Sequence, residues 1–132
     1  MKLLLDTHIW VWSMADEARL SGPVRRALED PANERWISSI SIWEVLILAE
    51  RGRLMLVPDA RSWVAQAMTV SPLREAPVTI DVALASRAVR LHTQDPADRF
   101  IAASAALFGL TLVTADGDLG ACPDIEVLPN TG

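Results

Sequence analysis

Short apolar runs alternate along the chain with longer segments of helical spacing. The short runs predict strands over residues 1–5, 35–38, 78–80 and 110–114, with a candidate fifth strand over 126–128. The longer segments predict helices over residues 7–14, 23–29, 41–51, 59–70, 81–91 and 96–108. Strands that alternate with helices are typical of a mostly parallel sheet covered on both faces. We therefore expect an α/β fold with three layers, α/β/α, around a mostly parallel four- or five-stranded sheet.

Several of the predicted helices have ordinary start and stop signals. Pro23 occupies the favoured first position of its helix. Gly52 follows the helix predicted over 41–51 and is a good C-terminal cap. At the start of that helix, Ser41 and Glu44 have the spacing of a capping box.

Length and composition narrow the class of protein. A chain of 132 residues, 51% of them hydrophobic, suits one domain with a sizeable core, so we expect a single domain over residues 1–132. No apolar run approaches the roughly 18 residues that a membrane span needs, and Asp6 interrupts any signal-peptide pattern. The single cysteine, Cys122, excludes an internal disulfide. These features favour a cytoplasmic protein without a membrane partner.

The charge balance argues against a broad electrostatic binder of nucleic acid. The formal net charge is −5 and Lys2 is the only lysine, whereas neutralising phosphates requires clustered positive charge. A polyanion can still be bound locally, through metal ions and a few arginines. Five tryptophans lie in the first half of the chain, and large aromatic side chains near a surface suit a protein interface.

Four carboxylates are predicted to meet at one edge of the sheet. Asp6 follows the first strand, and Asp116 follows the strand over 110–114. Glu44 and Asp98 lie in the first turns of helices that begin at the same edge, because β-α-β connections are right-handed. In open parallel sheets, ligand sites lie just beyond the carboxyl ends of the strands.

Each of the four acids also has a structural explanation, as a helix cap, a capping-box partner or a turn residue. The four together are harder to explain in this way, since like charges repel and are costly when partly buried without a counter-ion. A divalent cation offsets that cost. We therefore predict Mg²⁺, with Mn²⁺ as the alternative, bound by Asp6, Asp98, Glu44 and Asp116. Such a site can activate water for attack on a phosphodiester.

Other chemistries have less support. His8, His92 and Cys122 lack the spacing of a zinc site. The chain has neither a glycine-rich phosphate loop nor the Gly-x-Ser-x-Gly motif of serine hydrolases. We expect His8 to pack on its helix rather than to touch a substrate.

Four segments, in order and over nearly the whole chain, match a known family. They are LLLDTH at residues 3–8, SISIWEV at 39–45, DPADRFIAA at 95–103 and LTLVTAD at 110–116. With these segments the chain resembles the PIN-domain ribonucleases, and more narrowly the VapC-type toxins of bacterial toxin–antitoxin pairs. The resemblance implies a PIN-like fold and a metal-dependent endoribonuclease that hydrolyses RNA phosphodiester bonds by metal-activated water.

The resemblance places Asp6, Glu44, Asp98 and Asp116 at the acidic positions of the family, as catalytic and metal-binding residues. It implies that Asp6 and Asp98 are the principal metal ligands. Glu44 would hold the metal directly or through water and orient the attacking water. Asp116 would complete the site, with Asp118 as a rival for that role.

Four neighbouring residues receive lesser roles. Thr7 and Thr114 are expected to position acids or phosphate. Asp95 lies close to the site, but capping is a sufficient explanation for it. Arg99 is expected to form an ion pair rather than to bind RNA.

The resemblance also implies partners. Besides an RNA substrate, members of the family commonly form homodimers and bind a small VapB-like antitoxin that occupies or distorts the acidic site. We expect Trp10, Trp12 and Trp43 to mark the partner surface.

Three alternatives remain open from the sequence. The first is a non-catalytic PIN-like binding module, whose function lies in its partner. The second is a phosphatase-like hydrolase with Asp6 as the covalent nucleophile, although His8 occupies the place of that class's second aspartate. The third is a nuclease for DNA, since these residues show no requirement for a 2′-hydroxyl.

Overall fold

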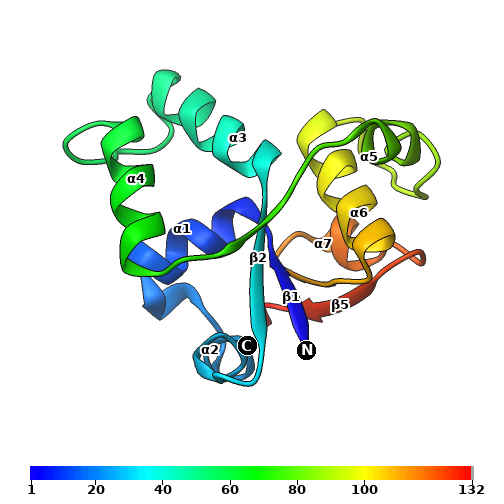
Figure 1. The fold of residues 1–132 in the computed structure, drawn as a ribbon, viewed down its shortest axis with the longest axis horizontal. Coiled ribbons are helices and arrows are strands. Elements are labelled where there is room, and N and C mark those ends of the chain that lie inside the picture. Colours follow the sequence, from blue (N-terminus) through cyan, green and yellow to red (C-terminus); the bar gives the residue numbers. More distant parts are fainter. Residues whose placement is uncertain (132) are drawn as a thin grey trace.

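A computed structural model describes residues 1–131 and contains a five-stranded sheet in which every paired strand is parallel (Figure 1). The strands are β1 (Lys2–Leu5), β2 (Glu34–Ser38), β3 (Arg74–Ala76), β4 (Thr111–Thr114) and β5 (Glu126–Pro129), in the spatial order β3-β2-β1-β4-β5. The central strand β1 pairs with both β2 and β4. The predicted α/β fold with a parallel sheet is confirmed, with five strands.

Helices cover both faces of this sheet. They are α1 (Thr7–Ala15), α2 (Gly22–Glu29), α3 (Ser39–Glu50), α4 (Ala60–Val70), α5 (Ile80–Ala85), α6 (Pro96–Phe108) and α7 (Gly117–Gly120), with a 3₁₀ turn η1 (Glu17–Arg19). Figure 1 shows α1, α2 and α4 on one side of the sheet and α5 and α6 on the other. Helix α3 contacts α1, α4 and α6 and so joins the two sides.

Alternate residues of β1 divide the core into two clusters. Leu3 and Leu5 pack with residues of α1, α2 and α4, whereas Leu4 packs with residues of α5 and α6. All three leucines are almost completely buried. Burial of such a side chain contributes about 2 kcal/mol, and successive residues of a strand face opposite sides. The apolar run at residues 3–5 is therefore explained by a strand covered on both faces.

The third strand is not where the apolar pattern predicted it. β3 is Arg74–Ala76, and the predicted strand over residues 78–80 is wrong. β3 is an edge strand that pairs only with β2. Backbone hydrogen bonds to β2 are enough to form it, so its sequence need not be apolar. Thr79 instead caps α5, because its hydroxyl accepts a hydrogen bond from the Val82 N–H at 3.1 Å.

Helix α3 begins at Ser39 rather than at Ser41. Ser38 is the cap, since its hydroxyl oxygen accepts the Ile40 N–H at 3.1 Å. The predicted capping box is therefore wrong, and Glu44 lies in the second turn of the helix rather than the first. Ser41 is fully buried instead of capping.

The helix predicted over 81–91 ends early, at Ala85, and the turns that follow it are held by Arg99. This arginine is 6% exposed, on the first turn of α6. Its guanidinium group donates to the carbonyls of Ser86 (2.8 Å), Val89 (2.9 Å), Thr93 (3.0 Å) and Leu91 (3.3 Å). The predicted ion pair of Arg99 is wrong among the described residues, because backbone carbonyls take its place.

Helix α6 has the predicted bounds, 96–108, and Gly109 ends it with a positive φ of 64°. The predicted turn after Asp116 is a short helix, α7. Within residues 1–131, no helix combines the length and the apolar character that crossing a membrane requires.

Candidate active site

The four predicted acids lie around one pocket. It has a volume of about 390 Å³ and is lined by Asp6, His8, Trp12, Glu44, Asp95, Asp98, Ala115 and Asp116. We call it the acid pocket, because five of these eight residues are carboxylic acids. The structure thus brings together all four sequence-predicted site residues, which span residues 6 to 116 of the chain.

The parallel sheet explains this convergence. Asp6 directly follows β1, and its N–H donates to the Val113 carbonyl of β4 at 3.0 Å. Asp116 follows β4 and caps α7. In Figure 1, α1 and α3 begin close to the ends of β1 and β2, at the edge where α6 also begins. The acids of four separate segments therefore share the carboxyl edge of the sheet.

Asp6 is the most firmly held of the acids. Asp6 is only 7% exposed to solvent. One carboxylate oxygen accepts the Thr7 N–H at 2.7 Å, and the other accepts the Thr114 hydroxyl at 2.7 Å. Burial raises the pKa of Asp6 above its usual value, and the charge of Asp116 adds to this effect, while the two hydrogen bonds oppose it. Its orientation is thus fixed by the start of α1 and by the end of β4.

Thr7 links the first acid to α3. Its hydroxyl donates to the Ser41 hydroxyl oxygen at 2.9 Å, and both side chains are fully buried. This bond holds the start of α1 against α3, the helix that positions Glu44. Burial raises the pKa of Glu44, and the nearby charges of Asp6 and Asp95 raise it further.

Asp98 shows the strongest effect of crowding. Its pKa is raised to about 7, first by burial and then by the charges of four other carboxylates, namely those of Asp95, Asp6, Asp116 and Glu44. Carboxylates this close cannot all be ionised without a cost. The acid pocket therefore concentrates negative charge that a cation would relieve.

Two further aspartates near the site can now be distinguished. Asp95 lines the acid pocket and also caps α6, accepting the Ala97 N–H at 2.9 Å. Asp118, the predicted rival of Asp116, lies in the first turn of α7 and is exposed, and it does not line the acid pocket. The geometry favours Asp116 over Asp118 as the fourth acid.

Sequence reasoning undervalued two aromatic residues of the pocket. His8 is exposed and lines the acid pocket while its ring lies beside Trp12 of the same helix, so packing on its helix and access to a substrate do not exclude each other. Trp12, half-buried one turn later, lines the same pocket, and its ring lies 5.8 Å from that of His8. Their spacing of four residues places them on one face of the helix, but the apolar sequence of α1 does not say which face meets the pocket.

The other tryptophans divide between core and surface. Trp10 is 1% exposed and packs edge-on against Trp63, with ring centroids 5.3 Å apart. The expectation that Trp10 belongs to a partner surface is therefore wrong. Trp43 is 51% exposed on α3 and remains a candidate for that role.

The donor set of the acid pocket fits a hard divalent cation. Carboxylate oxygens are the ligands that Mg²⁺ and Mn²⁺ prefer. Burial, and after it the charges of neighbouring carboxylates, raises the pKa of three of the four acids, and a bound cation would oppose both effects. As placed, no three Asp, Glu, His or Cys side chains of residues 1–131 form a ready set of metal ligands. The carboxylates would have to turn toward an ion to bind it together.

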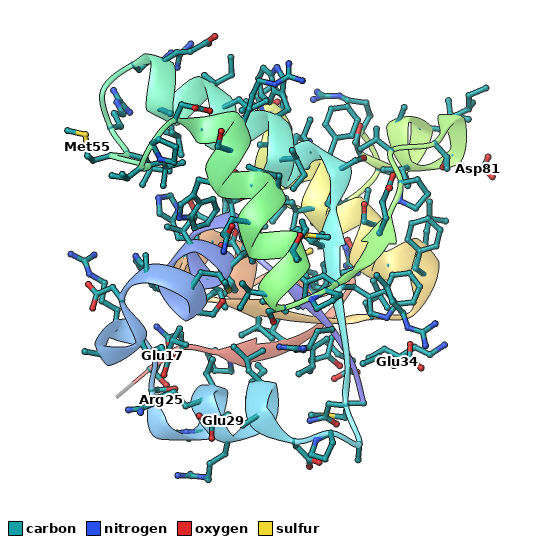
Figure 2. The ribbon with its side chains drawn as sticks, turned by 60° about the vertical axis from the view of Figure 1, so that its left-hand side comes forward. Glu17, Arg25, Glu29, Glu34, Met55 and Asp81 are labelled. Carbon is teal, nitrogen blue, oxygen red and sulfur yellow. The ribbon has the colours of Figure 1, made fainter. Side chains whose placement is uncertain are left out.

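A second pocket of about 330 Å³ lies away from the four acids, among α1, α2, β2 and the segment after α4. Figure 2 labels three residues of its lining, with Glu17 beyond the end of α1 and Arg25 and Glu29 on α2. Its rim mixes both charges, so it does not share the purely acidic chemistry of the first pocket.

Comparisons with known proteins agree with this fold. The PIN domain family matches residues 3–123. Ribonuclease VapC22 of Mycobacterium tuberculosis is 38% identical over 117 residues, which make up 86% of each protein. A toxin–antitoxin complex from Klebsiella pneumoniae contains a chain with a TM-score of 0.67 at 25% identity, with 98% of both chains covered. VapBC2 from Rickettsia felis, bound to a DNA fragment from its promoter, matches with a TM-score of 0.71 at 18% identity over 98% of both chains, a likeness of fold alone.

The fold and the pocket define an α/β protein with carboxylates gathered at the carboxyl edge of a parallel sheet. This chain belongs to the PIN domain family. The resemblance to VapC-type members that the four sequence segments predicted is confirmed, since the similarity to VapC22 covers most of both chains.

Proposed function

We propose that the protein is a metal-dependent endoribonuclease and the toxin of a type II toxin–antitoxin pair. The observation that supports this most directly is the convergence of Asp6, Glu44, Asp98 and Asp116 on one pocket. The relative named Ribonuclease VapC22 supports cleavage of RNA as the activity. The toxin–antitoxin complexes among the similar structures support the role as a toxin.

We assign the cation to the four acids, as Mg²⁺ or Mn²⁺. When bound, such an ion would lower the pKa of a water molecule and offset negative charge on the scissile phosphate. Asp6 and Asp98 are the principal ligands in this assignment. Asp6 is already oriented by its bonds to Thr7 and Thr114, and Asp98 has the strongest electrostatic reason to bind a cation.

Glu44 and Asp116 complete the proposed site. Glu44 extends from the second turn of α3 and can orient the attacking water and accept its proton. The backbone N–H groups of Asp118 and Leu119 donate to one oxygen of Asp116, at 2.8 and 3.1 Å, which leaves the other oxygen for the ion.

The proposed partners follow from the same family. A small VapB-like antitoxin would bind over or beside the acid pocket, and Trp43 with Trp12 offers aromatic area for it. We also propose a homodimer and a cytoplasmic location, where the single cysteine stays reduced.

Two alternatives make different use of the same residues. A covalent nucleophile at Asp6 is disfavoured by the burial of this side chain and by the hydrogen bonds on both of its oxygens. A non-catalytic binding module has no need of four converging carboxylates, which are costly to hold together.

The test is cleavage of labelled RNA by protein freed of any co-purifying antitoxin, with Mg²⁺, with Mn²⁺ and with EDTA. We expect cutting that EDTA abolishes. Asp6→Asn and Asp98→Asn should each lower kcat/KM by about 10²- to 10³-fold, the usual cost of removing one electrostatic contact to a reacting group.

Asp118→Asn is the matched control, since Asp118 is an exposed neighbour that does not line the acid pocket. It should cut like the wild type. A protein that cuts no RNA in either metal, or whose Asp98→Asn variant cuts normally, would contradict the proposal. Equal cutting of a DNA strand of the same sequence would instead identify a less specific nuclease.

A further inference from the structure

One wall of the acid pocket is formed by two aromatic side chains instead of carboxylates. His8 and Trp12 lie one turn apart on α1, and both line the pocket beside the acids. Their ring planes are inclined by 51° and their centroids are 5.8 Å apart. The guanidinium carbon of Arg19 lies 5.4 Å from the centroid of the Trp12 ring. His8, Trp12 and Arg19 therefore form a row of neighbouring side chains beside the acids.

This row matters because the pocket repels a polyanion. Of the residues that line it, five are carboxylic acids, and His8 is the one side chain that can become positive. The chain as a whole has a formal charge of −5. Phosphate contacts to basic residues supply most of the affinity in ordinary nucleic-acid binding, and the lining of this pocket offers hardly any.

Stacking of bases on aromatic rings does not need positive charge on the protein. Every base has a π-face, and aromatic side chains that stack on unpaired bases are a common way to hold single strands. The Arg19 guanidinium on the Trp12 ring can extend such a stack outward. Arg19 is also paired with Asp16 at 3.1 Å, so it adds little net charge for phosphate.

We propose that the wall of His8 and Trp12 is the binding site for the unpaired base next to the scissile phosphate, and that Trp12 is the residue on which this base stacks. This inference rests on the proposed nuclease function. Trp12 supplies the stacking face, and His8, nearer the acids, fixes the sugar and base between the wall and the carboxylates. A base inside a duplex is already stacked on its neighbours and cannot reach this wall.

The closing experiment first maps the cut made by the wild type in a mixed-sequence single-stranded oligoribonucleotide. Oligoribonucleotides with one abasic position on either side of that cut are then compared with the intact strand. The comparison is made for the wild type, Trp12→Leu, Trp12→Phe and His8→Ala, each by kcat and KM. For each protein the kcat/KM on abasic RNA is divided by its own kcat/KM on intact RNA. A smaller fraction of folded protein lowers both values equally and therefore cancels in the ratio.

For the wild type we expect one abasic position to lower kcat/KM by about tenfold to a hundredfold. Trp12→Leu should lose a similar factor on intact RNA, mostly as a higher KM, and should then be insensitive to the abasic position. Trp12→Phe should recover the sensitivity, because it restores a ring.

Trp36→Leu is the matched control. Trp36 is also half-buried and also has an arginine over its ring, Arg74 at 6.0 Å, but it lies on β2 and does not line the acid pocket. Its abasic sensitivity should equal that of the wild type.

The inference is overturned if Trp12→Leu remains as sensitive to each abasic position as the wild type, or if the wild type is insensitive to both abasic positions. In both cases cleavage by the wild type keeps the proposed nuclease function intact. If the wild type cuts no RNA in Mg²⁺ or Mn²⁺, the proposed function fails, and this inference fails with it.

Discussion

At the scale of single residues, the fold brings the carboxylates of the acid pocket so close together that keeping them ionised costs free energy. Asp98 has its pKa raised to about 7 by burial and by the negative charge of four other carboxylates. No basic side chain other than His8 lines the pocket to relieve this charge. A residue that only capped a helix would gain nothing from such surroundings, which supports the proposal of a bound cation.

The pH dependence of stability follows from this shift. Asp98 binds a proton more tightly in the folded protein than in the unfolded one, where its pKa is near 3.8. The free energy of unfolding should therefore fall as pH rises from about 4 to about 7 in metal-free protein. Asp98→Asn should reduce this fall and should be more stable than the wild type above about pH 7, by about 1 kcal/mol after solvent screening.

Thermal melting in EDTA across this pH range measures the effect, which corresponds to about 4 °C at the upper end. Asp118→Asn is the control and should follow the wild type. A variant Asp98→Asn that melts below the wild type at high pH would show that the carboxylate has a stabilising structural role instead.

At the scale of elements, Arg99 joins two segments that sequence reasoning treated separately. Its guanidinium group binds four carbonyls of the turns between α5 and α6. The same residue follows Asp98 in the first turn of α6. The turns, the helix start and one acid of the pocket are thus fixed by one buried side chain.

Arg99→Met should therefore destabilise the protein by about 3 kcal/mol, because it leaves buried carbonyls without donors. Arg99→Lys should recover only part of this, since an ammonium group cannot reproduce the planar fork. Chemical denaturation measures both. Arg87→Met is the control, because Arg87 is exposed and makes only long contacts to Gln94, at 3.4 and 3.5 Å. A loss for Arg99→Met no larger than for Arg87→Met would refute the role given to these bonds.

At the scale of the whole molecule, alternation of strands and helices was enough to predict the parallel sheet and the edge where the acids meet. The run at residues 3–5 and the small apolar residues of α6 leave few other folds available. What failed depended on tertiary contacts. β3 exists because β2 offers a partner to its backbone, and the burial of Trp10 depends on Trp63, far along the chain.

The candidate site shows the same division. The four acids could be chosen from the sequence because each follows a strand, or lies near the start of a helix, at the carboxyl edge of the predicted parallel sheet. They are Asp6, Glu44, Asp98 and Asp116. His8 and Trp12 could not be assigned in the same way, since apolar residues surround them on α1 and leave no clear polar face. Which side of that helix meets the pocket is decided by its packing against the sheet and α3.

Binding of metal should stabilise the whole fold. An ion that binds only the folded protein raises the free energy of unfolding by mass action, by about 2.7 kcal/mol at a hundredfold excess over its Kd. Melting temperature should rise with Mg²⁺ or Mn²⁺ for the wild type and for Asp118→Asn. It should rise much less for Asp6→Asn and Asp98→Asn. An equal rise in all four proteins would place the ion elsewhere.

The order of the strands has a consequence for biosynthesis. β1 precedes the other strands in the sequence yet occupies the middle of the sheet. Its neighbour β4 comes more than a hundred residues later, and Thr114 of β4 then donates a hydrogen bond to Asp6. A growing chain on the ribosome therefore holds its carboxylates apart, in water, with no cleft between them. The proposed cleavage activity can therefore arise only after β4 has been translated, which leaves time for the proposed antitoxin to be present.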